Sequence, residues 1–100
     1  MSYTIAFQKG ALKDYDEACK WYREKSLDTE INFQETLDQR LQDIADNPDA
    51  YGVRFKDVRA ISLKKSPYLI FYKIEHSTQF VYIIAIWHEA RDRNVLERRS

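Results

Sequence analysis

The chain has 100 residues, 16 acidic and 16 basic side chains, and a hydrophobic fraction of 44%, which indicates one ordinary globular domain over residues 1–100 and excludes a disordered chain. No apolar run approaches the ~18 residues of a membrane span, no signal peptide is visible, and the single Cys19 cannot close an internal disulfide. We therefore expect a reduced, cytoplasmic location and no membrane partner.

The first half of the chain predicts one strand and a long helix. Tyr3 to Phe7 alternates weakly between apolar and polar residues, which indicates a short strand at or next to a sheet edge. From Lys9 or Gly10 to Lys25 the apolar residues recur at helical spacing, which predicts an amphipathic helix. Its expected apolar stripe contains Leu12, Tyr15, Ala18, Cys19, Trp21 and Tyr22.

A second helix follows after a short break at residues 26–28. Asp28 is its predicted N-cap, and Pro48 ends it because proline cannot continue a helix. The connection is short, so we expect the two helices to form an antiparallel hairpin. The apolar face of the second helix contains Phe33, Leu37, Leu41, Ile44 and Ala45.

The second half of the chain predicts strands. Residues 49–57 have the composition of a turn, and Arg59 to Lys64 alternates like a strand. Tyr68 to Ile74 and Phe80 to Trp87 are apolar runs too short for core helices, and the polar residues 75–79 between them have hairpin length. Such runs predict a strand hairpin that is buried on both faces.

The predicted order is therefore β-α-α-β-β-β, with a short C-terminal helix from Asp92 to Arg99. Helices that are grouped together, rather than alternating with strands, indicate an α+β fold. We expect an N-terminal strand and an antiparallel helical hairpin packed on one face of a small, mainly antiparallel sheet.

A series of short motifs runs in order along nearly the whole chain. They are Trp21-Tyr22, Phe33-x-x-x-Leu37-x-x-x-Leu41-x-x-Ile44, Asn47-Pro48-x-x-Tyr51, Val58-Arg59, Pro67-Tyr68-Leu69-Ile70-Phe71-Tyr72 and Ile86-Trp87-His88-x-x-Arg91-Asp92. Together they resemble the RelE/ParE superfamily of bacterial type II toxin–antitoxin toxins. The last two motifs look most like the ParE-like, plasmid stabilisation pattern.

The resemblance implies a small toxin that is neutralised by a cognate antitoxin. An amphipathic segment of that antitoxin is expected to cover an apolar groove beside the helical hairpin or a sheet edge. In the ParE-like branch the target is DNA gyrase and no cleavage site is known. In the RelE-like branch the toxin is a ribosome-dependent mRNA endonuclease whose partners are the ribosome and mRNA. A homologue that binds an antitoxin without being toxic is a third alternative.

Two positions weigh against the endonuclease. By the resemblance, Leu69 stands where those enzymes commonly have an arginine, and Glu89 stands near their next one. RNA cleavage needs cations and proton-transferring groups around the phosphate, which a carboxylate would repel. His88 and Arg91 are the catalytic candidates if the chain is a nuclease. We favour the non-enzymatic, gyrase-directed alternative.

The two halves of the chain differ in charge. Residues 1–50 carry a net charge of −5 and residues 51–100 a net charge of +5, which suggests a basic face aimed at an acidic partner or nucleic acid. The candidate partner-binding residues are Arg59, Lys64, Lys65, Arg91, Arg93, Arg98 and Arg99. Truncation after Trp87 is expected to spare folding and remove toxicity.

Plainer roles remain open for several of these side chains. Arg91 would then form an ion pair with Glu89 or Asp92, and His88 would be a hydrogen-bonded histidine at a strand end. His76, in the hairpin connection, is expected to be exposed and without a partner.

Two glycines provide no phosphate-binding loop, and two histidines with one cysteine have no metal-ligand spacing. We expect neither a cofactor nor a metal site.

Overall fold

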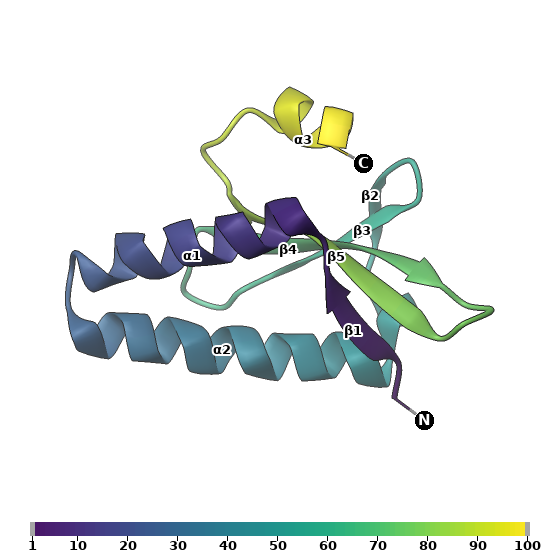
Figure 1. Ribbon diagram of the computed structural model, residues 1–100, viewed down its shortest axis with the longest axis horizontal. Helices are drawn as coiled ribbons and strands as arrows, with labels where there is room; N and C mark the ends of the chain where they lie inside the picture. The colour runs from purple at the N-terminus through teal and green to yellow at the C-terminus, as the bar shows by residue number, and fades with distance from the viewer. Residues whose placement is uncertain (1, 100) are drawn as a thin grey trace.

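The computed structural model describes residues 2–99 and contains a five-stranded sheet in the order β1-β5-β4-β3-β2. The elements are β1 (Thr4–Phe7), α1 (Lys9–Arg23), α2 (Leu27–Asp46), the 3-10 helix η1 (Pro48–Ala50), β2 (Val53–Phe55), β3 (Val58–Ser62), β4 (Tyr68–Glu75), β5 (Phe80–His88) and α3 (Arg93–Arg99). β1 runs parallel to β5, and the other neighbouring strands are antiparallel. The predicted α+β fold is confirmed, and Figure 1 shows α1 and α2 running side by side as a hairpin.

The predicted N-cap of α2 was wrong by two residues. Ser26 has an extended backbone, and its Oγ accepts a hydrogen bond from the Thr29 N–H at 3.1 Å, so Ser26 is the cap. Asp28 lies instead in the first helical turn, where its negative charge interacts favourably with the helix dipole. The two polar residues compete for one capping position, and sequence alone did not separate them.

One face of the sheet packs against the helical hairpin. Leu37 and Ile44 of α2 and Ala18 of α1 are almost completely buried there. The same cluster takes in the residues of β4 and β5 that point to this face, namely Tyr68, Ile70, Tyr72, Val81, Ile83 and Ile86.

The buried stripe of α1 is rotated from the predicted one. Leu12 is 53% exposed, whereas Ala11, Asp14 and Ala18 are buried. The small side chains of the two alanines let α1 approach β5 closely. A carboxylate therefore occupies a position that helical periodicity would assign to an apolar residue.

The other face of the sheet has its own apolar layer beneath α3. Leu96 of α3 is fully buried against Leu69 and Phe71 of β4 and Trp87 of β5. Because successive strand residues point to opposite faces, these residues alternate with those that face the helical hairpin. The predicted burial of both strands on both faces is confirmed.

Residues 49–57 do not form a simple turn. They contain η1 and the short edge strand β2, which pairs with β3 at two positions only and with an irregular register. Three residues are too few to show an alternating pattern, so this strand could not be predicted from periodicity.

Candidate functional site

Two of the candidate residues, His88 and Arg91, lie where β5 ends. We call this the β5-end site and define it as Trp87, His88 and Arg91 together with Asp14 and Trp21 of α1. His88 is the last residue of β5 and lies opposite the first residue of β4 in the antiparallel register. The segment from residue 89 then leads directly into α3.

His88 is held in a half-buried position by aromatic neighbours. Its ring meets those of Trp21 and Tyr68 edge-on, with centroid distances of 5.6 and 5.1 Å. Its Nδ1 accepts a hydrogen bond from the Ala90 N–H at 3.1 Å. Burial raises the pKa of Tyr68, which keeps that phenol protonated beside the histidine. The geometry is that of a fixed, hydrogen-bonded histidine at a strand end.

The Asp14 side chain bonds to the part of the β5 edge that β1 leaves uncovered. β1 pairs with β5 only as far as Ile83, so the strand has no neighbour on that side beyond this point. The Asp14 side chain, which is 3% exposed, reaches this edge, and its Oδ2 accepts a hydrogen bond from the Ile86 N–H at 3.2 Å. A buried backbone donor that lacks a strand partner is thereby satisfied.

Two arginines share this carboxylate. Arg99 Nη1 lies 2.6 Å from Asp14 Oδ2, and Arg91 Nη1 lies 3.5 Å from Asp14 Oδ1. The Arg91 guanidinium also lies over the Trp87 ring, 3.7 Å from its centroid. The alternative in which Arg91 pairs with Glu89 or Asp92 is therefore replaced by a pairing with Asp14, because α1 supplies the anion from far along the chain.

Arg99 is tied into the protein by further contacts. It donates a hydrogen bond to the Ile84 carbonyl at 3.2 Å, beside a register shift in the β4–β5 pairing. Its guanidinium also packs against Gly10, where an added Cβ would lie 3.1 Å from the guanidinium carbon. Partner binding by Arg99 remains a prediction, and the side chain already anchors α3 to α1 and β5.

Arg59 lies away from the β5-end site. It pairs with Tyr72 in the register, four residues along β4 from the residue opposite His88, which is about 13 Å at the rise of a strand. Its guanidinium donates to the Tyr51 carbonyl at 2.6 Å and forms an ion pair with Asp49 at 3.6 Å. The structure therefore does not bring Arg59 together with His88.

The two remaining arginines lie on α3. The Arg93 guanidinium is 5.8 Å from the Phe71 ring centroid. Arg98 is exposed and lines an open, polar hollow between α3 and the β2–β3 turn. The seven candidate cations are thus divided among several surfaces.

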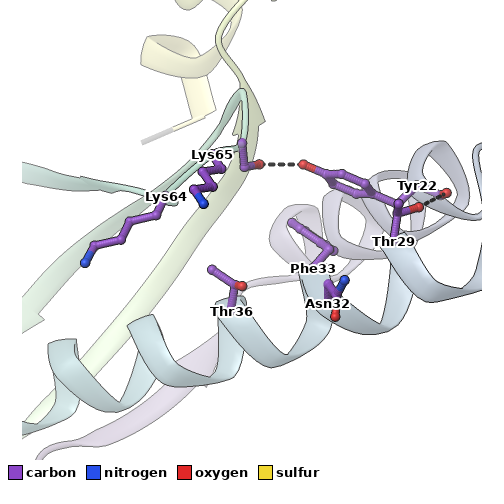
Figure 2. A pocket seen from close by; sticks show the side chains of 8 residues that line it. Tyr22, Thr29, Asn32, Phe33, Thr36, Lys64 and Lys65 are labelled. Carbon is purple, nitrogen blue, oxygen red and sulfur yellow. Dashed lines mark hydrogen bonds between the residues drawn. The ribbon is translucent and has the colours of Figure 1, made fainter.

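Lys64 and Lys65 line a groove between the helical hairpin and the β3–β4 turn (Figure 2). Its volume is about 290 Å³, and its lining residues are Tyr22, Thr29, Asn32, Phe33, Thr36, Lys64, Lys65 and Ser66. The Tyr22 hydroxyl and Ser66 Oγ form a hydrogen bond of 2.6 Å that holds the turn beside α1. The lining combines an aromatic floor, hydroxyl groups and two cations, without a carboxylate.

His76 has a partner, contrary to the prediction. Its Nε2 lies 3.0 Å from Asp49 Oδ1, and its ring meets that of Tyr3 edge-on. Asp49 belongs to η1, which is distant in the sequence, so no local pattern pointed to this contact. The expected exposure of His76 is confirmed.

Asp14 is the functional candidate that sequence reasoning missed. A signal was present, because an acidic residue three places after Ala11 and four before Ala18 falls on the small-residue face of α1.

Within residues 2–99 there is no cluster of His, Cys, Asp and Glu side chains suited to hold a metal ion. No helix in the same range combines the length and hydropathy of a membrane span.

Comparisons with known proteins agree with this architecture. A family model described as the ParE toxin of the type II toxin–antitoxin system parDE matches residues 5–93. A chain of the chromosomal ParDE system from P. aeruginosa is 12% identical with a TM-score of 0.74, and the match covers 87% of this chain and 96% of that one. No curated protein matches.

Two E. coli structures are also similar. A mutant of the toxin RelE in the free state is 20% identical with a TM-score of 0.70, over 99% of this chain and 94% of that one. A chain of the intact RelBE toxin–antitoxin complex is 22% identical with a TM-score of 0.66, over 90% of this chain and 100% of that one. At these identities the likeness shows the shared fold.

Proposed function

We propose that this chain, which belongs to the ParE toxin family of type II toxin–antitoxin systems, inhibits DNA gyrase and is neutralised by a cognate antitoxin. Family membership makes it the toxin component. The choice of gyrase over the ribosome rests on the character of the sheet face beneath α3.

The centre of that face is apolar and covered by α3, and arginines lie over its aromatic rings, Arg93 over Phe71 and Arg91 over Trp87. Leu69, at the position where the resemblance places an arginine in the endonucleases, is 9% exposed and belongs to the layer under Leu96. Ala60 of β3 lies in the same layer. Metal-free cleavage of a phosphodiester needs cations aimed at the developing negative charge, and these three side chains offer none. This observation supports a toxin that acts by binding.

The β5-end site supplies an exposed contact surface for such binding. Trp21 is 36% exposed, and its ring lies under the Lys25 ammonium group, 4.1 Å from the centroid. The Arg91 side chain is 42% exposed beside the half-buried His88. Aromatic and arginine side chains of this kind often dominate the energetics of protein interfaces.

A supercoiling assay with purified gyrase tests the proposal. The wild-type protein should inhibit supercoiling, Arg91→Gln should weaken the inhibition, and Lys13→Gln, which also removes one positive charge, at an exposed position of α1, should not. Adding the antitoxin should restore gyrase activity. Normal supercoiling at a large molar excess of the toxin would contradict the proposal.

An mRNA endonuclease is the second candidate, and one feature favours it. His88 is fixed through Nδ1, and its Nε2 makes no hydrogen bond within residues 2–99, so that nitrogen is available to contact a substrate. Primer extension on cellular mRNA would then show cuts that depend on the toxin and the ribosome and that disappear in His88→Gln. A transcript pattern unchanged by the toxin would remove this candidate.

The groove in Figure 2 is our proposed docking place for the antitoxin. It lies beside the helical hairpin, and the half-buried Tyr22 ring, which stacks on the buried Phe33, offers an aromatic contact for an apolar side chain. Lys64 and Lys65 would attract acidic residues flanking that side chain. An amphipathic segment with acidic residues fits this combination.

A further inference from the structure

Asp14 has one more cationic partner than a buried carboxylate at the edge of β5 needs. A buried carboxylate needs a cation nearby, because an unpaired buried charge is strongly destabilising. Arg99 meets this need at 2.6 Å, and the Ile86 N–H supplies a further hydrogen bond at the same oxygen. Arg91 is a second cation on one anion, so the three side chains together carry a charge of +1.

The placement of Arg91 differs from that of Arg99. The Arg99 side chain is 25% exposed, and its guanidinium donates inward to the Ile84 carbonyl. The Arg91 side chain is 42% exposed, and one of its nitrogens points to Asp14. Its guanidinium lies 3.7 Å from the Trp87 ring centroid, closer than that of Arg99 at 5.0 Å. A guanidinium has five N–H donors, so Arg91 keeps donors that the protein does not use.

We infer that Asp14 is a positioning residue, which holds the Arg91 guanidinium flat over Trp87 so that its remaining donors face an oxyanion of the toxin's target. An arginine ordered before binding loses less conformational entropy when it binds. The identity of the target as gyrase rests on the proposed function, whereas the ordering of Arg91 is a property of the free protein.

Asp14→Asn removes the charge that pairs with Arg91 and Arg99 and keeps an oxygen acceptor at the edge of β5. The amide oxygen of asparagine has the same reach and can still accept from the Ile86 N–H, but the charge that holds Arg91 is lost. The matched control is Asp16→Asn, which makes the same change at an exposed position of α1. The heteronuclear NOE of the Arg91 Nε–Hε group, measured in the free protein, should be high in the wild type and the control and should fall in Asp14→Asn. An unchanged NOE in Asp14→Asn would overturn the inference.

Gyrase inhibition supplies the second readout. Losing the pre-ordering of one long side chain should weaken inhibition about three- to tenfold in Asp14→Asn. Adding Arg91→Gln to that variant should cost no more than Arg91→Gln alone, since both changes remove the same contact. Additive losses, or wild-type inhibition by Asp14→Asn at a temperature where it is fully folded, would contradict the positioning role.

Arg91→Lys is a second variant, which tests the inference even if Asp14→Asn does not fold. It keeps the positive charge and leaves Asp14 paired with Arg99, but an ammonium group cannot lie flat on the indole ring. It should inhibit gyrase about as weakly as Asp14→Asn, and equal inhibition by Arg91→Lys and the wild type would refute the inference. If the wild type leaves gyrase untouched, the proposed function fails, and the NOE still decides whether Asp14 orders Arg91.

Discussion

At the scale of single residues, Tyr72 links the sheet to the segment that follows α2. Its side chain is fully buried, and its hydroxyl donates a hydrogen bond to the Pro48 carbonyl at 2.7 Å. Burial raises the pKa of Tyr72, so the hydroxyl remains a donor throughout the neutral range.

Replacing Tyr72 by phenylalanine should therefore destabilise the fold. The Pro48 carbonyl would lose its donor, which costs about 1–3 kcal/mol of unfolding free energy. Urea denaturation measures this difference. Tyr82→Phe, at a half-buried position, should change the unfolding free energy by less than about 0.5 kcal/mol. Equal effects of the two substitutions would show that the buried hydrogen bond does not stabilise the fold.

The ion pair between Glu30 and Arg23 predicts that the stability of the fold decreases at low pH. Arg23 Nη2 lies 2.6 Å from Glu30 Oε2, and this hydrogen bond and charge lower the pKa of Glu30 from its ordinary 4.5. A lowered folded-state pKa gives stability that is present above pH 4.5 and is lost as the pH falls through the lowered value. The melting temperature of the wild type should exceed that of Glu30→Gln at pH 7, and this difference should shrink toward pH 3. A difference that does not change with pH would contradict the pairing.

The limits of sequence reasoning are clearest at Asp14 and Arg91. His88 and Arg91 were identified because they follow an apolar strand directly. Asp14 was not, because its partners Arg91 and Arg99 are more than 70 positions away and only the folded chain brings them to α1. Charges that pair across such distances leave no local pattern.

At the scale of elements, α3 covers one face of the sheet. Leu96→Ala should cost about 2–5 kcal/mol, since it opens a cavity over the apolar layer of β4 and β5. Val95→Ala, at a neighbouring position that is 42% exposed, should stay within about 0.5 kcal/mol of the wild type. Thermal and urea unfolding measure both. A Leu96 variant as stable as the Val95 variant would mean that α3 does not cover a core.

This packing argues against the expectation that truncation after Trp87 spares folding. Such a truncation removes Leu96 and Arg99, which exposes the second apolar layer and leaves Asp14 without its 2.6 Å partner. Loss of toxicity in that variant would therefore reflect lost stability as well as a lost contact surface.

If the antitoxin binds in the groove beside the helical hairpin, the two lysines of the groove should affect how fast it binds. Reversing both charges with Lys64→Glu and Lys65→Glu should slow antitoxin association about tenfold, because electrostatic attraction mainly sets the association rate. Lys13→Glu with Lys20→Glu, two exposed positions on α1, is the matched control. Surface plasmon resonance with the antitoxin measures both pairs, and equal rates would place the antitoxin elsewhere.

The elements themselves were largely predictable. The two apolar runs of β4 and β5 and the helical period of α1 and α2 are local patterns that match the observed bounds closely. β2 was missed because it is three residues long, and the rotated face of α1 was missed because alanines carry little hydrophobic signal.

At the scale of the whole molecule, the division of charge serves the fold as well as any partner. Asp14 and Asp49 of the acidic half form ion pairs with Arg91, Arg99 and Arg59 of the basic half. Part of the predicted basic face is therefore used inside the protein. The exposed remainder lies at the β5-end site, in the groove and on α3, which suits a protein that binds more than one partner.

The most direct test is to induce the toxin in bacterial cells and to follow DNA synthesis and protein synthesis in parallel by pulse labelling. A gyrase inhibitor should reduce DNA synthesis first and cause DNA damage, while translation continues and mRNA stays intact. An immediate stop of translation with cleaved mRNA, before any change in DNA synthesis, would contradict the account.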